Sequence, residues 1–166
     1  IRAYCVNVMI ESPLPKNPNA PDDARMLARG ASRLLGDMGY ATLVEFSLKN
    51  NRRADVAGLD ARGKFIILEI KTSVADFRAD QKWPEYLEFC DAFYFAVPEN
   101  FPTEILPNDH GLMIVDRFGG TIVRPALGRP MNPARRKTLT VRFARKAASR
   151  LTELRDPPIS DRDLGA

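Results

Sequence analysis

The chain has 166 residues, of which 45% are hydrophobic and 28% charged, and this composition suits one globular domain with its own apolar core. Its 25 Lys and Arg residues outnumber 21 Asp and Glu residues, and the net charge of +4 is compatible with a polyanionic partner. Two cysteines without CxxC spacing and one histidine exclude histidine-rich metal sites, argue against thiolate zinc sites and fit a reducing compartment. No apolar run approaches the roughly 20 residues of a membrane span, so we expect no membrane segment.

The first half of the chain predicts an extended segment, a helix and three strands, in that order. Repeated prolines indicate an extended N-terminal segment over residues 1–20. Two acids after Pro21, apolar residues at helical spacing and a closing glycine predict a helix over 22–38. The period then changes to two, which predicts strands over 41–48, 53–60 and 64–72. Because the third strand is nearly all apolar, we expect it to be central and buried on both faces.

The next part of the chain predicts shorter elements. Ser73 to Asp76 resembles a capping box that begins a helical turn. The elements that follow are a short helix and three strands, over 85–89, 91–97, 111–116 and 121–124. His110 lies in Asn108-Asp109-His110-Gly111, between two of those strands, and we interpret it as a solvated turn residue. Residues 21–124 are thus expected to form the core of a single domain.

The C-terminal part predicts a basic helix. Residues 125–156 are interpreted as a linker and a helix over 134–154 that packs on the core, followed by a loose tail over 157–166. The helix has an apolar stripe at helical spacing, made of Leu139, Phe143, Ala147, Leu151 and Leu154. Arg142, Lys146 and Arg150 belong to its basic face. They either contact DNA phosphates or only keep the outer face of a docked helix solvated, and both alternatives stay open.

A predicted hairpin brings two acids together. Asp60-Ala61-Arg62-Gly63-Lys64 has the form of a three-residue loop that ends in glycine, so residue 60 faces residue 64. In that register Asp55 faces Glu69, and directly opposed side chains share a face with Cβ atoms roughly 4.5–5.5 Å apart. Lys71 lies two residues beyond Glu69 on the same face, and the carbonyl of Ile70 stays near both acids.

These groups predict a divalent-metal site. Two carboxylates in a partly dry site repel each other, and a hard cation such as Mg²⁺ or Mn²⁺ relieves that repulsion. We expect Asp55, Glu69 and the Ile70 carbonyl to bind the ion, and Lys71 to orient water or balance phosphate charge. The alternative is a structural ion pair between Lys71 and one acid. Glu45, on the preceding strand, is either a third acid of the site or a solvated, ion-paired residue.

The same residues resemble a nuclease superfamily. Asp55, thirteen intervening residues and Glu69-Ile70-Lys71 resemble the D…(E)XK signature of PD-(D/E)XK nucleases, although Ala54 stands where the signature has proline. The resemblance extends over roughly residues 22–97. It implies a restriction-endonuclease-like fold, a three-layer α/β/α core with a central mixed sheet. It also implies that Asp55, Glu69 and the Ile70 carbonyl are metal ligands and that Lys71 is the catalytic lysine.

Three segments resemble a narrower family. KTSVADFRAD at 71–80, KWPEY at 82–86 and DAFYFAVP at 91–98 are similar to the bacterial MmcB-like DNA-repair family, which is assigned to this superfamily. The resemblance implies a DNA-binding repair protein of the bacterial cytoplasm, associated with the nucleoid, without a small-molecule cofactor and with other repair proteins as further partners. Our first hypothesis is a Mg²⁺-dependent DNA endonuclease or exonuclease that hydrolyses phosphodiesters. The alternatives are a repair protein that binds DNA without cleaving it and a protein-interaction domain on the same scaffold.

Four residues near the motif are candidate DNA contacts. Arg53, Arg78 and Lys82 could meet phosphates. Trp83 could stack on a splayed base, and its alternative role is simple packing beside Pro84.

Overall fold

The structure, a computed structural model, describes residues 20–157. The extended segment expected over 1–20 and the tail expected over 157–166 therefore lie almost entirely outside the described residues. Among residues 20–157, no helix combines the length and the apolar character that crossing a bilayer requires.

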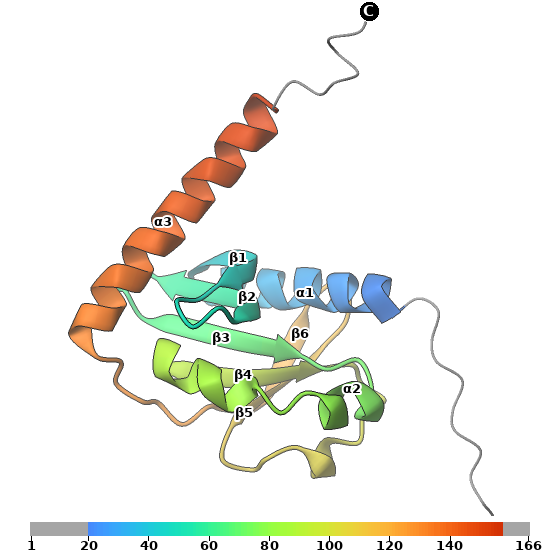
Figure 1. Ribbon diagram of the computed structural model, residues 1–166. Coiled ribbons are helices and arrows are strands. Elements are labelled where there is room, and N and C mark those ends of the chain that lie inside the picture. The colour runs from blue at the N-terminus through green and yellow to red at the C-terminus, as the bar shows by residue number, and fades with distance from the viewer. Residues whose placement is uncertain (1–19, 158–166) are drawn as a thin grey trace, which may run out of the picture.

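Within the described residues, the strands form one six-stranded mixed sheet in the order β1-β2-β3-β4-β5-β6 (Figure 1). They are β1 (Tyr40–Ser47), β2 (Arg53–Asp60), β3 (Phe65–Ile70), β4 (Ala92–Val97), β5 (Gly111–Val115) and β6 (Gly120–Arg124). β1, β2 and β3 form an antiparallel meander, β3, β4 and β5 run parallel, and β6 pairs antiparallel with β5. β3 is buried along its whole length, so the predicted central strand is confirmed.

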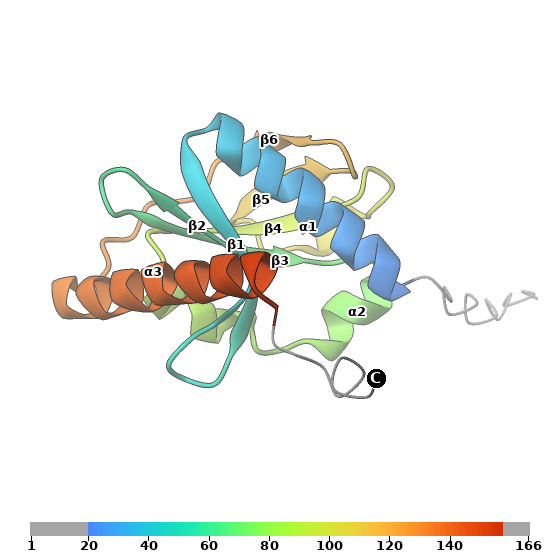
Figure 2. The ribbon, with the colours of Figure 1, turned by 90° about the horizontal axis from the view of Figure 1, so that it is seen from above.

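Helices cover both faces of this sheet. They are α1 (Ala20–Asp37), α2 (Val74–Ala79), α3 (Pro133–Arg155) and the 3₁₀ helices η1 (Trp83–Phe89) and η2 (Thr103–Ile105). Buried residues of α1 belong to one apolar cluster, whereas buried residues of η1 and α3 belong to a second cluster on the opposite face. Figures 1 and 2 show α1 lying across the sheet on one side. This single-domain, mixed α/β architecture confirms the predicted fold class and is consistent with a restriction-endonuclease-like fold.

α1 packs closely against the sheet because its inner face carries apolar and small residues. Leu27, Ala31 and Leu35 recur at every fourth position and are buried, so one stripe of the helix meets the core. Gly30 lies on the same side, where a Cβ atom would come within 1.7 Å of the carbonyl oxygen of Asp116. Any side chain at this position would push α1 away from the turn between β5 and β6.

The other face is built largely from aromatic side chains. Phe143 of α3 makes edge contacts with Phe46 and Phe65, with ring centroids 5.5 and 5.9 Å apart. α3 docks through this residue and Leu139, both buried. Ala147 of the predicted stripe also packs against this cluster, whereas the last two residues do not: Leu151 is 48% exposed and Leu154 81% exposed. Figure 1 shows the reason, since the C-terminal half of α3 extends past the sheet.

The prediction for His110 is wrong. We expected a solvated turn residue, but His110 is only 6% exposed. Its ring makes edge contacts with Trp83 and Phe93, at centroid distances of 4.7 and 5.6 Å. Burial lowers the pKa of His110, although the neighbouring Asp109 acts in the opposite direction. A neutral imidazole can pack as an aromatic ring, and the polar sequence around it gave no sign of the aromatic surface that receives it.

The hairpin between β2 and β3 has the predicted register. The amide of Gly63 donates to the carbonyl of Asp60 at 3.0 Å, and Gly63 has a φ of +79°, as a left-handed closing residue requires. Val56 pairs with Leu68 and Ala57 with Ile67. Continued by one residue, this register brings Asp55 and Glu69 to the same level of the sheet.

Candidate active site

Asp55 lies where the pairing of β2 with β3 ends. The last backbone pair is Val56 with Leu68, and beyond it the Ile70 amide donates to Oδ2 of Asp55 at 2.8 Å. The Asp55 carboxylate thus accepts from the Ile70 amide in place of a backbone carbonyl of β2. Burial raises the pKa of Asp55, against the opposing effects of the Ile70 amide and Lys71. The carboxylate therefore sits in a partly dry position that favours charge compensation.

Glu69 is the acid that interrupts the apolar β3 strand, and it is only 5% exposed. One oxygen, Oε1, accepts from Lys71, whereas the buried Oε2 accepts no hydrogen bond from any group of residues 20–157. Burial first, and then the charge of Asp55, raise the pKa of Glu69 to about 9. A buried carboxylate oxygen without a partner is costly, so this atom is poised to accept a proton or a cation.

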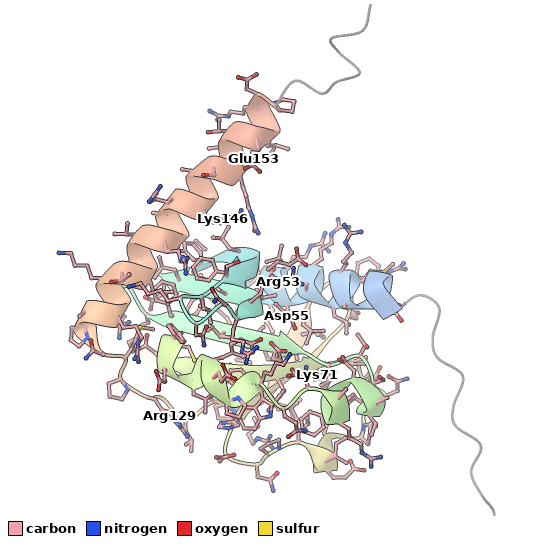
Figure 3. The ribbon with its side chains drawn as sticks, in the orientation of Figure 1. Arg53, Asp55, Lys71, Arg129, Lys146 and Glu153 are labelled. Atoms are coloured by element: carbon pink, nitrogen blue, oxygen red, sulfur yellow. The ribbon has the colours of Figure 1, made fainter. Side chains whose placement is uncertain are left out.

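Lys71 follows β3 and is 3% exposed. Its Nζ lies 3.1 Å from Oε1 of Glu69 and 2.6 Å from Oδ2 of Asp80. Burial alone would lower the pKa of Lys71, but Glu69 and Asp80 outweigh it and the pKa is raised. The ammonium group is therefore held charged between two carboxyls. Figure 3 shows Asp55 and Lys71 close to the end of β3, beside α2.

Asp80 is a member of this cluster that the sequence analysis did not identify. α2 starts, as the capping-box pattern predicted, with the Ser73 side chain accepting from the Asp76 amide. Its six residues then return the chain, so that Asp80 at its end meets Lys71. Burial tends to raise the pKa of Asp80, but hydrogen bonds from Lys71 and from the Lys82 amide lower it overall. The capping box predicted where α2 begins, but it does not set where the helix ends, and the position of Asp80 depends on that end.

The cluster opens into a hollow of about 370 Å³, lined by residues that include Asp55, Glu69, Ile70, Lys71, Asp76 and Asp80. Within residues 20–157, no three Asp, Glu, His or Cys side chains are placed to hold a metal ion by themselves. A cation here would need the two carboxylates of Asp55 and Glu69, a backbone carbonyl such as that of Ile70, and water. All-oxygen ligands completed by water suit Mg²⁺ or Mn²⁺, and the unpartnered Glu69 oxygen fits such an ion.

Glu45 lies apart from this hollow. Its backbone has a φ of +49°, which is unusual for a residue with a side chain, and the surrounding pairs are Val44 with Val56 and Phe46 with Ala54. The Glu45 side chain is 63% exposed and lies 3.6 Å from Arg53. Of the two alternatives for Glu45, the structure favours the solvated, ion-paired residue over a third metal ligand.

The candidate DNA contacts are spread over different parts of the surface. Arg78 and Lys82 are exposed, and Lys82 also lines the hollow beside Lys71. Trp83 packs against Phe93, Phe95 and His110, which favours the packing role over base stacking.

Of the three candidate DNA contacts on α3, two are exposed and the third is hydrogen-bonded to β1. Arg142 and Lys146 are exposed. Arg150 instead donates to the carbonyl oxygen of Glu45 at 3.4 Å. That contact ties the far half of α3 to β1.

Comparisons with known proteins agree with this architecture. A protein of unknown function from Silicibacter pomeroyi, of solved structure, is 44% identical to this chain and superposes with a TM-score of 0.80. The match covers 84% of this chain and 96% of that protein. No curated protein matches this sequence. The model of the DNA repair protein MmcB-like family matches residues 12–158, well over half of the sequence. The chain therefore belongs to the MmcB-like family of DNA repair proteins.

Proposed function

We propose that this DNA-repair protein is a metal-dependent nuclease that hydrolyses phosphodiester bonds in DNA. The observation that carries the proposal is the buried pairing of Glu69 with Lys71 beside Asp55, at the mouth of an open hollow. A purely structural role would account for the ion pair, whereas Oε2 of Glu69 accepts no hydrogen bond from the described residues and faces a site open to a cation. Burying two acids and a lysine at one strand end costs stability, and such costs gather at functional sites.

Each residue has a chemical role in this proposal. Asp55, Glu69 and the Ile70 carbonyl would hold Mg²⁺ or Mn²⁺, which when bound polarises a phosphodiester and lowers the pKa of coordinated water. The Lys71 ammonium would donate a hydrogen bond to a phosphate oxygen or to the attacking water and balance the charge that develops. Asp80, 2.6 Å from Lys71, would act as a positioning residue that keeps the ammonium charged and directed.

The second candidate function is DNA binding without cleavage. It is favoured by one observation: Lys71 is already bonded to both Glu69 and Asp80. A lysine satisfied in this way could simply neutralise the acids of a structural site.

The test is incubation of labelled single-stranded, duplex and branched DNA with the protein, in Mg²⁺ or Mn²⁺ and in chelator. We expect cleavage that needs the metal and falls by at least about 100-fold in Glu69→Ala and in Lys71→Ala. Glu104→Ala and Lys64→Ala are the matched controls, because both residues are exposed and lie outside the hollow.

Two results would count against the nuclease. Cleavage that survives both substitutions would place the activity elsewhere. A wild-type protein that cuts none of the substrates would favour the DNA-binding role.

A further inference from the structure

A second hollow lies on the other side of Asp55. It measures about 890 Å³ and is bounded by α1 and by the neighbouring ends of β1 and β2. Asp55 and Ile70 line both this hollow and the smaller one that holds Glu69 and Lys71. The two hollows therefore meet at Asp55, which we assign to the metal. An extended ligand lying in the larger hollow would reach the smaller one.

The wall of this second hollow is strongly basic. Its lining holds four arginines against two acids, Glu45 and Asp55. Arg25, Arg29 and Arg33 come from α1 at every fourth position, so they form one row with about 6 Å between neighbours along the helix axis. Arg53 of β2 faces this row, and Figure 3 shows it beside α1 and close to Asp55.

Two of these arginines are available to a ligand. Arg25 and Arg29 are exposed, and no hydrogen bond or ion pair to another described residue is found for either. Arg33 is anchored by the carbonyl oxygens of Arg117 and Phe118, at 3.3 and 3.4 Å. Arg53 forms an ion pair with Glu45, at 3.6 Å. The positive charge that remains available to a ligand therefore lies at Arg25 and Arg29.

We infer that this hollow binds the phosphodiester backbone of a DNA strand and directs it to Asp55. Guanidinium groups bind phosphate oxygens through paired, planar hydrogen bonds, and the row spacing lets neighbouring arginines meet neighbouring phosphates of one strand. Between the arginines the lining holds Ala24, Ala28 and Val44, which sugars can approach without losing hydrogen bonds. It also holds Ser32, whose buried hydroxyl has no hydrogen-bond partner among residues 20–157. The direction of the strand toward a cleavage centre rests on the proposed function, whereas the binding of the backbone does not.

The first test removes charge. Arg25→Gln combined with Arg29→Gln is compared with Arg62→Gln combined with Lys64→Gln, which loses the same charge from exposed residues at the other end of the β2–β3 hairpin. Binding of labelled single-stranded and duplex DNA is followed by fluorescence anisotropy at several salt concentrations, in chelator. Near 0.1 M salt, loss of two phosphate contacts should weaken binding about 25-fold for a single strand and about 60-fold for a duplex. The control pair should bind like the wild type.

The second test inserts charge. Val44 and Val123 lie on the two edge strands, β1 and β6, and are 40% and 53% exposed, so a glutamate fits either position without disturbing the core. Val44→Glu places a carboxylate in the hollow and should weaken binding about 5- to 8-fold, the effect of one phosphate contact near 0.1 M salt. Val123→Glu should leave binding unchanged. Melting temperatures of all four variants check that the fold is retained.

The outcomes separate the alternatives. A loss of affinity confined to single-stranded DNA identifies a free strand as the ligand, and a loss confined to duplex DNA identifies one strand of a duplex. The inference is overturned if the wild type binds neither DNA, or if the arginine and Val44 variants bind as well as their controls. The binding assay contains chelator, so its result does not depend on cleavage. Binding that depends on the arginines, together with no cleavage in the separate assay with Mg²⁺ or Mn²⁺, would refute the nuclease and leave this inference standing.

Discussion

Glu69→Gln tests the buried acid because glutamine keeps the shape of the side chain but cannot ionise. The folded pKa of about 9 lies above the ordinary value of 4.5, because burial and Asp55 favour the protonated form. The folded state then binds more protons than the unfolded state between these two values. The free energy of unfolding should therefore be highest below the lower pKa and fall as pH rises toward the higher one. Glutamine cannot ionise, so the variant should lack this fall.

The size of the effect follows from the distance between pH 7 and the ordinary pKa of Glu69. Keeping the folded carboxyl neutral at pH 7 costs about 3 kcal/mol, at about 1.4 kcal/mol for each pH unit above the unfolded pKa. Lys71 lowers the pKa of Glu69 and the value of about 9 already includes its effect, so about 3 kcal/mol is the upper limit of the gain. We expect Glu69→Gln to be more stable than the wild type by about 1–3 kcal/mol at pH 7, or roughly 2–12 °C in melting temperature, and by less than about 1 kcal/mol at pH 5.

The assay is thermal melting in chelator between pH 5 and 8. Glu104→Gln is the control, because Glu104 is exposed, and its difference from the wild type should not depend on pH. Mg²⁺ should then raise the melting temperature of the wild type, by mass action, and raise that of Glu69→Gln less at the same concentration. A stability difference that stays the same from pH 5 to pH 8 would refute the reasoning about Glu69.

Two further predictions concern α3. Phe143→Ala should lower the free energy of unfolding by about 3–5 kcal/mol in denaturant titrations, because Phe143 is buried between Phe46 and Phe65, whereas Leu154→Ala at an exposed position should change it little. An equal effect of both substitutions would contradict the docking of α3 through its first half. Arg142→Gln with Lys146→Gln should weaken DNA binding for all sequences alike and lower the salt slope by roughly 0.7–0.9 for each lost contact, as measured by anisotropy. An unchanged slope would assign these exposed charges to solvation of the helix.

The parts of the site that follow from local rules were predictable from the sequence. The glycine that closes the hairpin sets the register, and the register in turn sets the level of Asp55 relative to Glu69. Alternation along β3 then places Lys71 beside Glu69, 3.1 Å away. Each step depends on residues within a single hairpin, where periodicity and turn geometry are informative.

Other features depend on contacts that no local pattern encodes. Asp80 reaches Lys71 because α2 is six residues long, and the capping box shows where that helix starts but not where it ends. Glu45 turns out of the site through a left-handed backbone conformation that nothing in Val44-Glu45-Phe46 predicts. His110 is buried only because Trp83 and the aromatic residues of β4 come together in the folded state.

The length of α3 shows a different limit. Its apolar stripe runs the whole length of the helix, and periodicity alone predicted docking throughout. Phe143 meets the sheet, but Leu154 lies beyond its edge and is 81% exposed. Amphipathic spacing shows which side of a helix can dock, whereas the extent of the surface that receives it is a property of the tertiary structure.

Calorimetric titration of Mg²⁺ and Mn²⁺ into the wild type, Asp55→Asn and Glu69→Gln tests most directly whether these acids form a metal centre. We predict one site in the wild type, and affinity at least about tenfold lower in each variant, because each removes a ligand charge. Glu104→Gln, an exposed acid outside the hollow, should bind like the wild type. Equal affinity in the wild type and Asp55→Asn, with the fold retained, would contradict the assignment of Asp55 to the metal.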